Sequence, residues 1–388
     1  MDEEKMLNHL SQAQIDIIAL WSVVQHSLSS YYKIQQNFTS LSSALKCENL
    51  YKWRELGLHK NHLQRFEAFH TEEGQLQFQQ LLNQIKKDTD FIVTENDDFY
   101  PTQLLPYSDR PPILFGQGNI HALLQPQIAI VGSRKSSPHG RQVAYDFAYY
   151  LSEKGFYINS GLADGIDKAA HCGGIKHNRT IAVMGTGLDL TYPTSHHTLR
   201  QDIIKHKGTI ISEFLPATKP LQQHFPRRNR IVSGLSLGVI VAEATLKSGS
   251  LITAKLAAEQ GKVVFAIPGH IYSDHHQGCH QLIREGAILV DHPEQIIEDL
   301  ALPTQWQHQQ TQQKSYENAD HLYNDDTLIA PHLFALYKQL NWVGQNIDQL
   351  AAALKIDIAT LTSYLMELEL SGLCMQQSGL YVRCRSHQ

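Results

Sequence analysis

The sequence lacks any run approaching the roughly 18 apolar residues that a membrane-spanning helix needs, so no membrane span is expected. It opens on MDEEKMLNHL, which is acidic and polar and unlike a secretory signal peptide. Cysteine is scarce: the 5 residues are widely spaced and form no CxxC pair, which argues against a disulfide framework. Together these absences predict a protein of the reducing cytoplasm.

An excess of positive charge is also missing. Lys and Arg number 33 against 38 Asp and Glu, which gives a formal net charge of -5. This excludes a protein that coats nucleic acid by bulk charge, so a site for a polyanion would have to be a local basic cluster. The 42% hydrophobic and 18% charged residues are typical of globular proteins, and 388 residues suit two or three domains.

The chain divides into four segments by pattern. Residues 1–88 are polar with apolar residues at helical spacing, which predicts a small helical domain. Residues 89–302 alternate between strand-like and helix-like stretches. Residues 303–327 are Gln-rich and aperiodic, as in a flexible linker. Residues 328–388 predict three helices and a short hairpin, which suggests a winged helix.

The second segment predicts a parallel sheet wound on both faces, an α/β fold. Its strand-like runs are nearly all apolar, as expected where helices cover both faces of a sheet. In order, they are FIVTEND, PPILFGQGN, QIAIVG, FYINSG, TIAVMG, GTIISE, GVIVAE, KVVFAIPG and AILV. Ligands of such folds bind beyond the carboxyl ends of the strands.

Small polar residues are concentrated at these strand ends. Glycines let a ligand approach the backbone closely, and Ser hydroxyls and helix N-terminal amides bind anionic oxygens. A tight turn needs glycine in any case, so one such turn is weak support, whereas several turns at one edge favour an anion site. The turns contain Gly132, Ser133, Arg134 and Lys135, then Ser160 and Gly161, Gly185, Thr186 and Gly187, Ser248, Gly249 and Ser250, and Pro268 and Gly269. They match neither GxGxxG nor GxxxxGK[ST], so a dinucleotide fingerprint and a P-loop are both unsupported.

The first turn leads into a predicted helix. Ser137 suits its N-cap and Pro138 its first position. The amides of His139 and Gly140 are then expected to face an anion, with Arg134 nearby as a full positive charge.

The densest basic cluster comes after the strand GTIISE and contains His224, Phe225, Arg227, Arg228, Asn229 and Arg230. An arginine guanidinium can donate two parallel hydrogen bonds to a phosphate, and a phenylalanine ring can stack on a base. The alternative is a solvated helix start. Because positive charges in a first helical turn oppose the helix dipole, the pattern favours a bound anion. We therefore predict exposed arginines here, Arg228 among them.

Carboxylates also fall near this edge, at Asp164, Asp167, Asp189, Glu213 and Glu243. Asp164 is expected to cap its helix, and the two glutamates to hold neighbouring amides or an arginine. No acid–base pair, Ser-His-Asp order or tetrahedral metal spacing stands out, so no catalytic residue, cofactor or metal is expected. Structural or surface roles are expected for the remaining candidate ligands, His171, Cys172, His275, His276, Cys279 and His280.

Several long segments of the chain resemble one known family. They are IAIVGSRKSS, NSGLADGIDKAAH, TIAVMGTGLDLTYP, ISEFLP, HFPRRNRIVSGLSLGVIVAEATLKSGSLITAKLAAEQGK, VFAIPGHI and GCHQLIREGA. In this order they are similar to the motifs of the DNA-processing protein A (DprA/Smf) family, over about residues 127–290.

The resemblance implies an extended Rossmann-like domain that binds single-stranded DNA, with a helical (SAM-like) start and a C-terminal winged helix. It also implies a homodimer that loads RecA recombinase onto incoming DNA during natural transformation, with no established catalysis. The family's basic pocket falls on Arg134 and on the Arg227–Arg230 segment. Some members carry a lysine after the Tyr192-Pro193 pair. In this chain the next four residues are Thr194, Ser195, His196 and His197. That part of the pocket is therefore expected to be weaker, or sensitive to pH.

Two alternatives concern nucleotides. Related Rossmann-like enzymes cleave nucleoside monophosphates with a Gly-Gly-x-Gly-Thr turn and a glutamate, for which the nearest counterparts are Ser248-Gly249-Ser250 and Glu243. The second alternative is a protein that binds a nucleotide as a sensor and does not convert it. The arginine cluster favours a polymeric phosphate backbone over both. For the dimer surface, the candidates are the segments KVVFAIPG and GCHQLIREGAILV.

Overall fold

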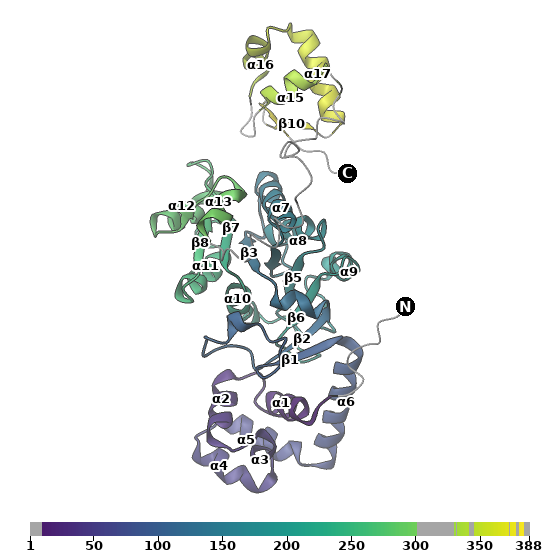
Figure 1. Cartoon of the computed structure of the whole chain (residues 1–388), viewed down its shortest axis with the longest axis vertical. Coiled ribbons are helices and arrows are strands. Elements are labelled where there is room, and N and C mark those ends of the chain that lie inside the picture. Colours follow the sequence, from purple (N-terminus) through teal and green to yellow (C-terminus); the bar gives the residue numbers. More distant parts are fainter. Residues whose placement is uncertain are drawn as a thin grey trace, which may run out of the picture. The chain divides into compact units, whose positions relative to one another are not determined.

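The computed structural model describes residues 10–300, 330, 332–340, 345–371, 373–377 and 380–383. The chain divides into two compact units, Met1–Leu302 and Pro303–Gln388 (Figure 1). The predicted linker at 303–327 falls outside the described residues. None of the described helices combines the length and apolar character that crossing a membrane requires.

The first unit begins with a group of helices, as predicted: α1 (Gln12–Val23), α2 (Leu28–Asn37), α3 (Leu41–Ala44), α4 (Leu50–Glu55), α5 (Lys60–Phe69) and α6 (Glu72–Asp88). Ser11, Ser27, Ser40 and Thr71 cap four of them by accepting a hydrogen bond from a first-turn amide. Trp21 and Trp53 are fully buried between these helices. The same core continues onto the sheet through Ile92, Ala182 and Ile210, so the helices pack directly on one of its faces.

The sheet has nine strands in the order β1-β2-β6-β5-β4-β3-β7-β8-β9. Their bounds are β1 (Phe91–Thr94), β2 (Ile113–Gly118), β3 (Gln127–Gly132), β4 (Tyr157–Ser160), β5 (Thr180–Val183), β6 (Thr209–Ser212), β7 (Gly238–Glu243), β8 (Val263–Ala266) and β9 (Ile288–Leu289). Strands β3 to β9 pair in parallel, which confirms the predicted α/β class. Strands β1 and β2 extend the sheet in antiparallel fashion, which the apolar pattern could not reveal.

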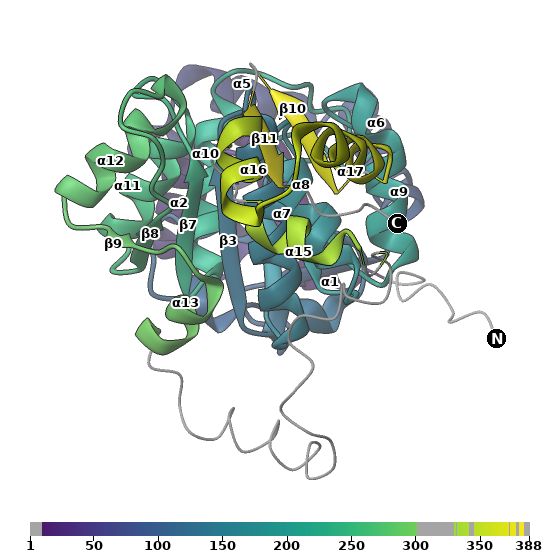
Figure 2. The ribbon, with the colours of Figure 1, turned by 90° about the horizontal axis from the view of Figure 1, so that it is seen from above.

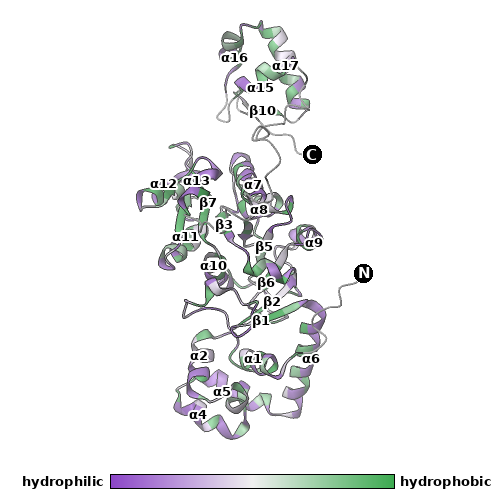
Figure 3. Cartoon of the chain, viewed as in Figure 1, coloured by the Kyte–Doolittle hydropathy of each residue, from purple (hydrophilic) through white to green (hydrophobic). Residues whose placement is uncertain are grey.

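Two helical layers cover the sheet (Figures 1 and 2). Alternate residues of β3 face the two different layers. Ile128 and Ile130 pack with α7 (Pro138–Glu153) and α8 (Ile166–Ile175). Ala129 and Val131 face α10 (His224–Leu235) and α11 (Ser250–Glu259). The remaining helices of the unit are α9 (His197–Lys205), α12 (Gln277–Arg284) and α13 (Pro293–Asp299). The strands are largely apolar, in keeping with burial on both sides (Figure 3).

The second unit has the predicted three helices and hairpin: α15 (Phe334–Gln339), α16 (Ile347–Leu354), α17 (Ile358–Leu370), β10 (Cys374–Gln377) and β11 (Leu380–Arg383). Leu336, Leu350 and Leu365 are buried in a core of their own. The strands pair antiparallel as the wing, and Gln345 bridges to Tyr381 beside them.

Candidate nucleic-acid interface

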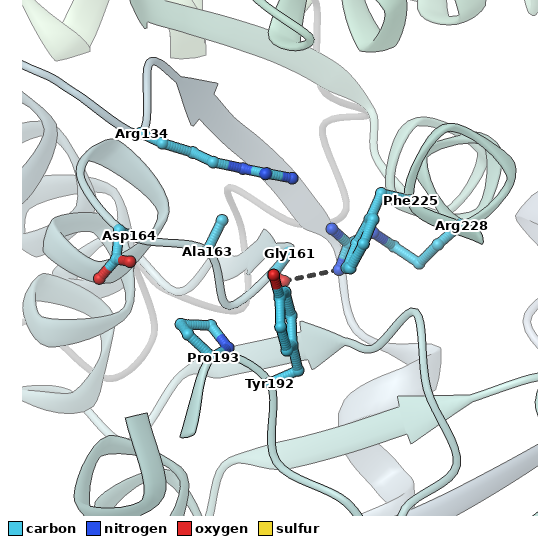
Figure 4. A pocket seen from close by; sticks show the side chains of 8 residues that line it. All are labelled: Arg134, Gly161, Ala163, Asp164, Tyr192, Pro193, Phe225 and Arg228. Carbon is cyan, nitrogen blue, oxygen red and sulfur yellow. Dashed lines mark hydrogen bonds between the residues drawn. The ribbon is translucent and has the colours of Figure 1, made fainter. Parts of the chain in front are cut away.

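A small pocket opens beyond the carboxyl ends of β3, β4 and β5, at the edge where the sequence predicts an anion site. It is lined by Arg134, Gly161, Ala163, Asp164, Tyr192, Pro193, Phe225 and Arg228 (Figure 4). Loops that follow the three strands supply most of this lining, and the first turns of α10 supply the rest. Residues almost 100 positions apart in the sequence thus meet at one point.

An exposed arginine and two aromatic rings form the mouth of the pocket. The Arg134 guanidinium carbon lies 5.3 Å from the centroid of the Phe225 ring. Tyr192 lies on the Phe225 ring at a centroid distance of 5.4 Å and an interplanar angle of 36°. Arg134 and Tyr192 are both exposed. In such an arrangement the cation can bind a phosphate, and an aromatic ring can offer its face to a base.

Arg228 forms the floor of the pocket and is buried, with 4% of its surface exposed, so the prediction that it is exposed is wrong. Its Nη1 atom donates to the carbonyl oxygen of Gly161 at 2.6 Å (Figure 4). The same atom also donates to the carbonyl oxygen of Val183. Burial lowers the pKa of Arg228 to about 10, while Asp167 opposes the shift, so the side chain stays charged at neutral pH. A Cβ atom at Gly161 would lie 2.3 Å from Arg228 Nη2, which explains the glycine.

The other two arginines of the cluster bind a carboxylate of the protein itself. Arg227 donates from Nε and Nη2 to the two oxygens of Glu213, at 3.0 and 2.9 Å. Arg230 donates from Nη1 and Nη2 to the same two oxygens, at 3.0 and 2.8 Å. Burial alone would raise the pKa of Glu213, but Arg230 and Arg227 outweigh it and hold that pKa below its usual range. The charge pattern predicts an anion at this helix start, and within the protein Glu213 supplies a negative charge for Arg227 and Arg230.

The N-terminus of α7 also interacts with a carboxylate of the protein itself. Ser137 caps the helix as predicted, by accepting a bond from the Gly140 amide at 2.9 Å. The anion expected there is the fully buried Glu243 of β7, which accepts from the Ser137 amide and hydroxyl at 2.9 and 2.5 Å. His275 Nδ1 lies 3.1 Å from the same carboxylate. The Gly140 amide is therefore bonded within the protein, and Glu243 supplies a negative charge beside this turn.

The comparisons with known proteins agree with this architecture. A family model described as DNA recombination-mediator protein A matches residues 91–301, and a model of the DprA winged helix domain matches residues 333–379. The chain belongs to the DprA/Smf family. The resemblance inferred from the motifs is thereby confirmed, and so is the winged helix.

Relatives within the family cover much of the chain. Protein Smf of Escherichia coli is 41% identical over 298 residues, which are 76% of this chain and 77% of that protein. DNA processing protein DprA of Streptococcus pneumoniae is 47% identical over 202 residues, which are 52% of this chain and 71% of that protein.

Two solved DprA structures share the fold. The X-ray structure of the Streptococcus pneumoniae protein superposes with a TM-score of 0.63 at 33% identity, over 76% of this chain and 99% of that one. A Helicobacter pylori structure described for its single-stranded DNA binding mode has a TM-score of 0.50 at 31% identity, over 54% of this chain and 95% of that one.

The remaining residues predicted for a DprA-like site lie outside the pocket lining. Ser133 and Ser160 are buried, and Ser160 Oγ donates to the Ile130 carbonyl at 2.7 Å. His224 is buried and stacks on Phe214 at 4.4 Å between centroids. Asn229 accepts a bond from Arg228 Nε. Five more lie at element ends. Gly132 closes β3, and Lys135 is exposed after it. Ser248, Gly249 and Ser250 lie at the start of α11, with the two serine hydroxyls 2.7 Å apart.

Sequence reasoning missed four of the lining residues as site residues: Ala163, Asp164, Tyr192 and Pro193. Tyr192 was used only to locate the position after which some family members carry a lysine. An aromatic side chain after a strand end was itself an indication that a DNA base could stack there. Asp164 was expected to cap α8, but Gly165 holds the cap position. Asp164 instead accepts a bond from His196 Nε2 at 2.8 Å. Within the described residues, no cluster of three or more His, Cys, Asp or Glu side chains is arranged to hold a metal.

Proposed function

We propose that the chain binds single-stranded DNA at the Arg134–Phe225–Tyr192 mouth and acts as a recombination mediator that loads RecA recombinase during natural transformation. The observation that carries the proposal is the exposed guanidinium of Arg134 packed on Phe225, with the exposed ring of Tyr192 beside it. Unpaired bases can stack on such rings, whereas the bases of a duplex are already stacked on each other. The Helicobacter pylori relative, described as binding single-stranded DNA, supports the same reading.

The size of the pocket favours a polymer over an enclosed nucleotide. Its volume is about 70 Å³, well below the roughly 300–1,000 Å³ of pockets that bury small molecules. A strand laid across the mouth needs only a phosphate and a base to engage it. For the alternative of nucleotide hydrolysis, Glu243 would have to be available, but it is buried and bonded to Ser137. We propose no catalytic role.

The test is a titration of labelled single-stranded and duplex DNA of equal length against the full chain at several salt concentrations. We expect tighter binding of the single strand and a linear fall of the logarithm of affinity with the logarithm of salt. Equal affinity for both forms would contradict the proposal. Release of free base from nucleoside monophosphates would favour the hydrolase alternative.

We further propose that two copies of the chain pair through the free edge of the sheet at β9. Ile288 and Leu289 of this strand are 37% and 49% exposed, and Ile271 and Tyr272 are 72% and 85% exposed. An exposed apolar edge strand favours pairing with another chain. Two sites on one strand would raise the apparent affinity through effective concentration.

Sedimentation of the chain at micromolar concentration tests this dimer. Leu289→Glu should give a monomer, whereas Leu76→Glu at the exposed position of α6 should leave the dimer intact. RecA loading should fall in the first variant alone. A monomeric wild type that loads RecA normally would contradict the dimer proposal.

A further inference from the structure

The helices α7 and α8 carry aromatic and basic side chains next to one another, outside the pocket lining. Both helices follow strands of the parallel sheet and lie side by side on one of its faces (Figure 1). Each therefore begins at the carboxyl edge of the sheet, where the mouth lies, and runs away from it. Helix α7 begins at Pro138, shortly after Arg134, and α8 begins at Ile166, shortly after Asp164. A strand that leaves the mouth can therefore continue along these helices.

One stripe of side chains on α7 consists of Arg141, Tyr145 and Tyr149. These residues follow one another at intervals of about one helical turn, so they share a face of the helix. The rings of Tyr145 and Tyr149 are stacked, with centroids 6.4 Å apart and an interplanar angle of 23°. His177 meets the Tyr149 ring edge-on at 4.6 Å, yet Tyr149 remains 40% exposed. An exposed ring that neighbouring rings hold in place offers a surface on which a base can stack.

A second stripe, on α8, consists of Lys168, Cys172 and Lys176, which also follow one another at intervals of about one turn. Both lysines are exposed. The two helix backbones approach each other closely at the stripes, because a Cβ atom at Gly173 would lie 2.5 Å from the carbonyl oxygen of Tyr145. Lys168 lies in the first turn of α8 and Lys176 directly after its last residue, so positive charge accompanies the rings of α7 along the helix pair.

We infer that the two stripes form a second stacking platform, on which a single strand of DNA leaving the mouth places a base against Tyr149 and phosphates against Lys168 and Lys176. The inference rests on the proposed function and extends the binding site beyond the mouth. At a rise of about 1.5 Å per residue, Tyr149 lies roughly 16 Å along α7 from Pro138, a distance that a few nucleotides span. Bases stack on aromatic rings with little regard to sequence, which suits a protein that receives any strand.

The charges around the platform decide which interaction contributes most to binding. Acidic residues flank the stripes, among them Glu153, one turn beyond Tyr149, and Asp202 of α9. The net attraction for phosphate is therefore modest, and we expect stacking on Tyr149 to supply most of the affinity at this site. A basic segment of another protein is the alternative occupant, but Arg141 and Lys168 would repel it.

The test compares the binding of a long and a short labelled oligothymidine, of about 16 and about 4 nucleotides, to the full chain. The short one covers the mouth alone, whereas the long one also reaches the platform. Tyr149→Ala should weaken binding of the long oligonucleotide about ten-fold, because one stacked base contributes about that factor, and should leave binding of the short one unchanged. Tyr149→Phe keeps the ring and should bind both as the wild type does. Tyr51→Ala, at a tyrosine of α4 that is 54% exposed, is the matched control.

The charge of Lys168 and the outcomes that would contradict the platform complete the design. Lys168→Ala should reduce the salt slope by about one for the long oligonucleotide alone, as expected for one lost phosphate contact. Wild-type affinity of Tyr149→Ala for the long oligonucleotide would overturn the inference. An equal loss for both lengths would overturn it too, because the ring would then act through the fold. If neither length binds the wild type, the proposed function fails and this inference with it.

Discussion

At the scale of single residues, the four arginines at and around the pocket have different surroundings. Arg134 is exposed at the pocket mouth, Arg228 is buried beneath it, and Arg227 and Arg230 share Glu213. A guanidinium bonded to backbone carbonyls or to a buried carboxylate supports the fold. Only one that is free to meet a ligand contributes directly to affinity.

Replacing Arg134 with alanine should weaken binding of single-stranded DNA and leave the fold intact. The side chain is exposed, so the free energy of unfolding should change by no more than about 0.5 kcal/mol. Loss of one phosphate contact should reduce the salt slope by about one. Lys135→Ala, at an exposed neighbour outside the pocket lining, is the control. An unchanged slope in Arg134→Ala would place this arginine outside the DNA path.

Replacing Glu213 with glutamine should strongly destabilise the protein. It removes the charge shared by Arg227 and Arg230 in a fully buried site, and breaking such a pair costs about 3–5 kcal/mol. The matched control is Glu67→Gln, because Glu67 pairs with Arg54 on the surface and such pairs contribute about 0–1 kcal/mol. Urea denaturation measures both. Equal losses in the two variants would contradict the structural role of Glu213.

At the scale of elements, local pattern predicted the strands and helices well. Each apolar run of the central segment contains a strand, and most of these strands are buried, which favours apolar residues on both faces of the sheet. The antiparallel addition of β1 and β2 was not predictable, since strand direction depends on how the intervening chain returns to the sheet. The helix cap at Ser137 was visible locally, but Glu243 behind it comes from β7, 106 residues away.

Replacing Ser137 with aspartate should destabilise α7, although aspartate is ordinarily as good an N-cap as serine. Its carboxylate would meet that of Glu243, which the Ser137 hydroxyl now contacts at 2.5 Å. We expect a loss of about 1–3 kcal/mol in the free energy of unfolding. Ser11→Asp at the cap of α1, an exposed position without acidic residues in the first turn, should be close to neutral. Wild-type stability of Ser137→Asp would contradict the close contact between this cap and Glu243.

At the scale of the whole molecule, the buried His171 and the partly buried His26 should make stability fall in acid. Burial is the main cause that lowers the pKa of His26 to about 4 and that of His171 to about 3, against about 6.5 in an unfolded chain. Between these values the unfolded chain binds more protons, so the free energy of unfolding decreases as pH falls below about 6.5. From pH 7 to pH 5 the loss should be about 2 kcal/mol for each of the two histidines.

Denaturant midpoints at the two pH values measure this loss. His26→Asn should remove roughly half of the histidine contribution, and asparagine tolerates the left-handed backbone at this position, where φ is 61°. His197→Asn, at an exposed histidine, should behave as the wild type. A wild type that is equally stable at pH 5 and pH 7 would contradict the burial of neutral histidines.

The sequence by itself determined the order of strands and helices, the family and the edge of the sheet where Arg134 and Phe225 meet. These follow from periodicity and from contiguous motifs, which are local properties. The tertiary structure alone decided which charges are available to a ligand. Glu213 and Arg230 are 17 residues apart, Asp164 and His196 are 32 apart, and Ser137 and Glu243 are 106 apart. A hydrogen bond requires its atoms to lie within about 3 Å, and salt screens the attraction between exposed charges beyond about 10 Å. Folding therefore has to bring each pair together before its members can interact.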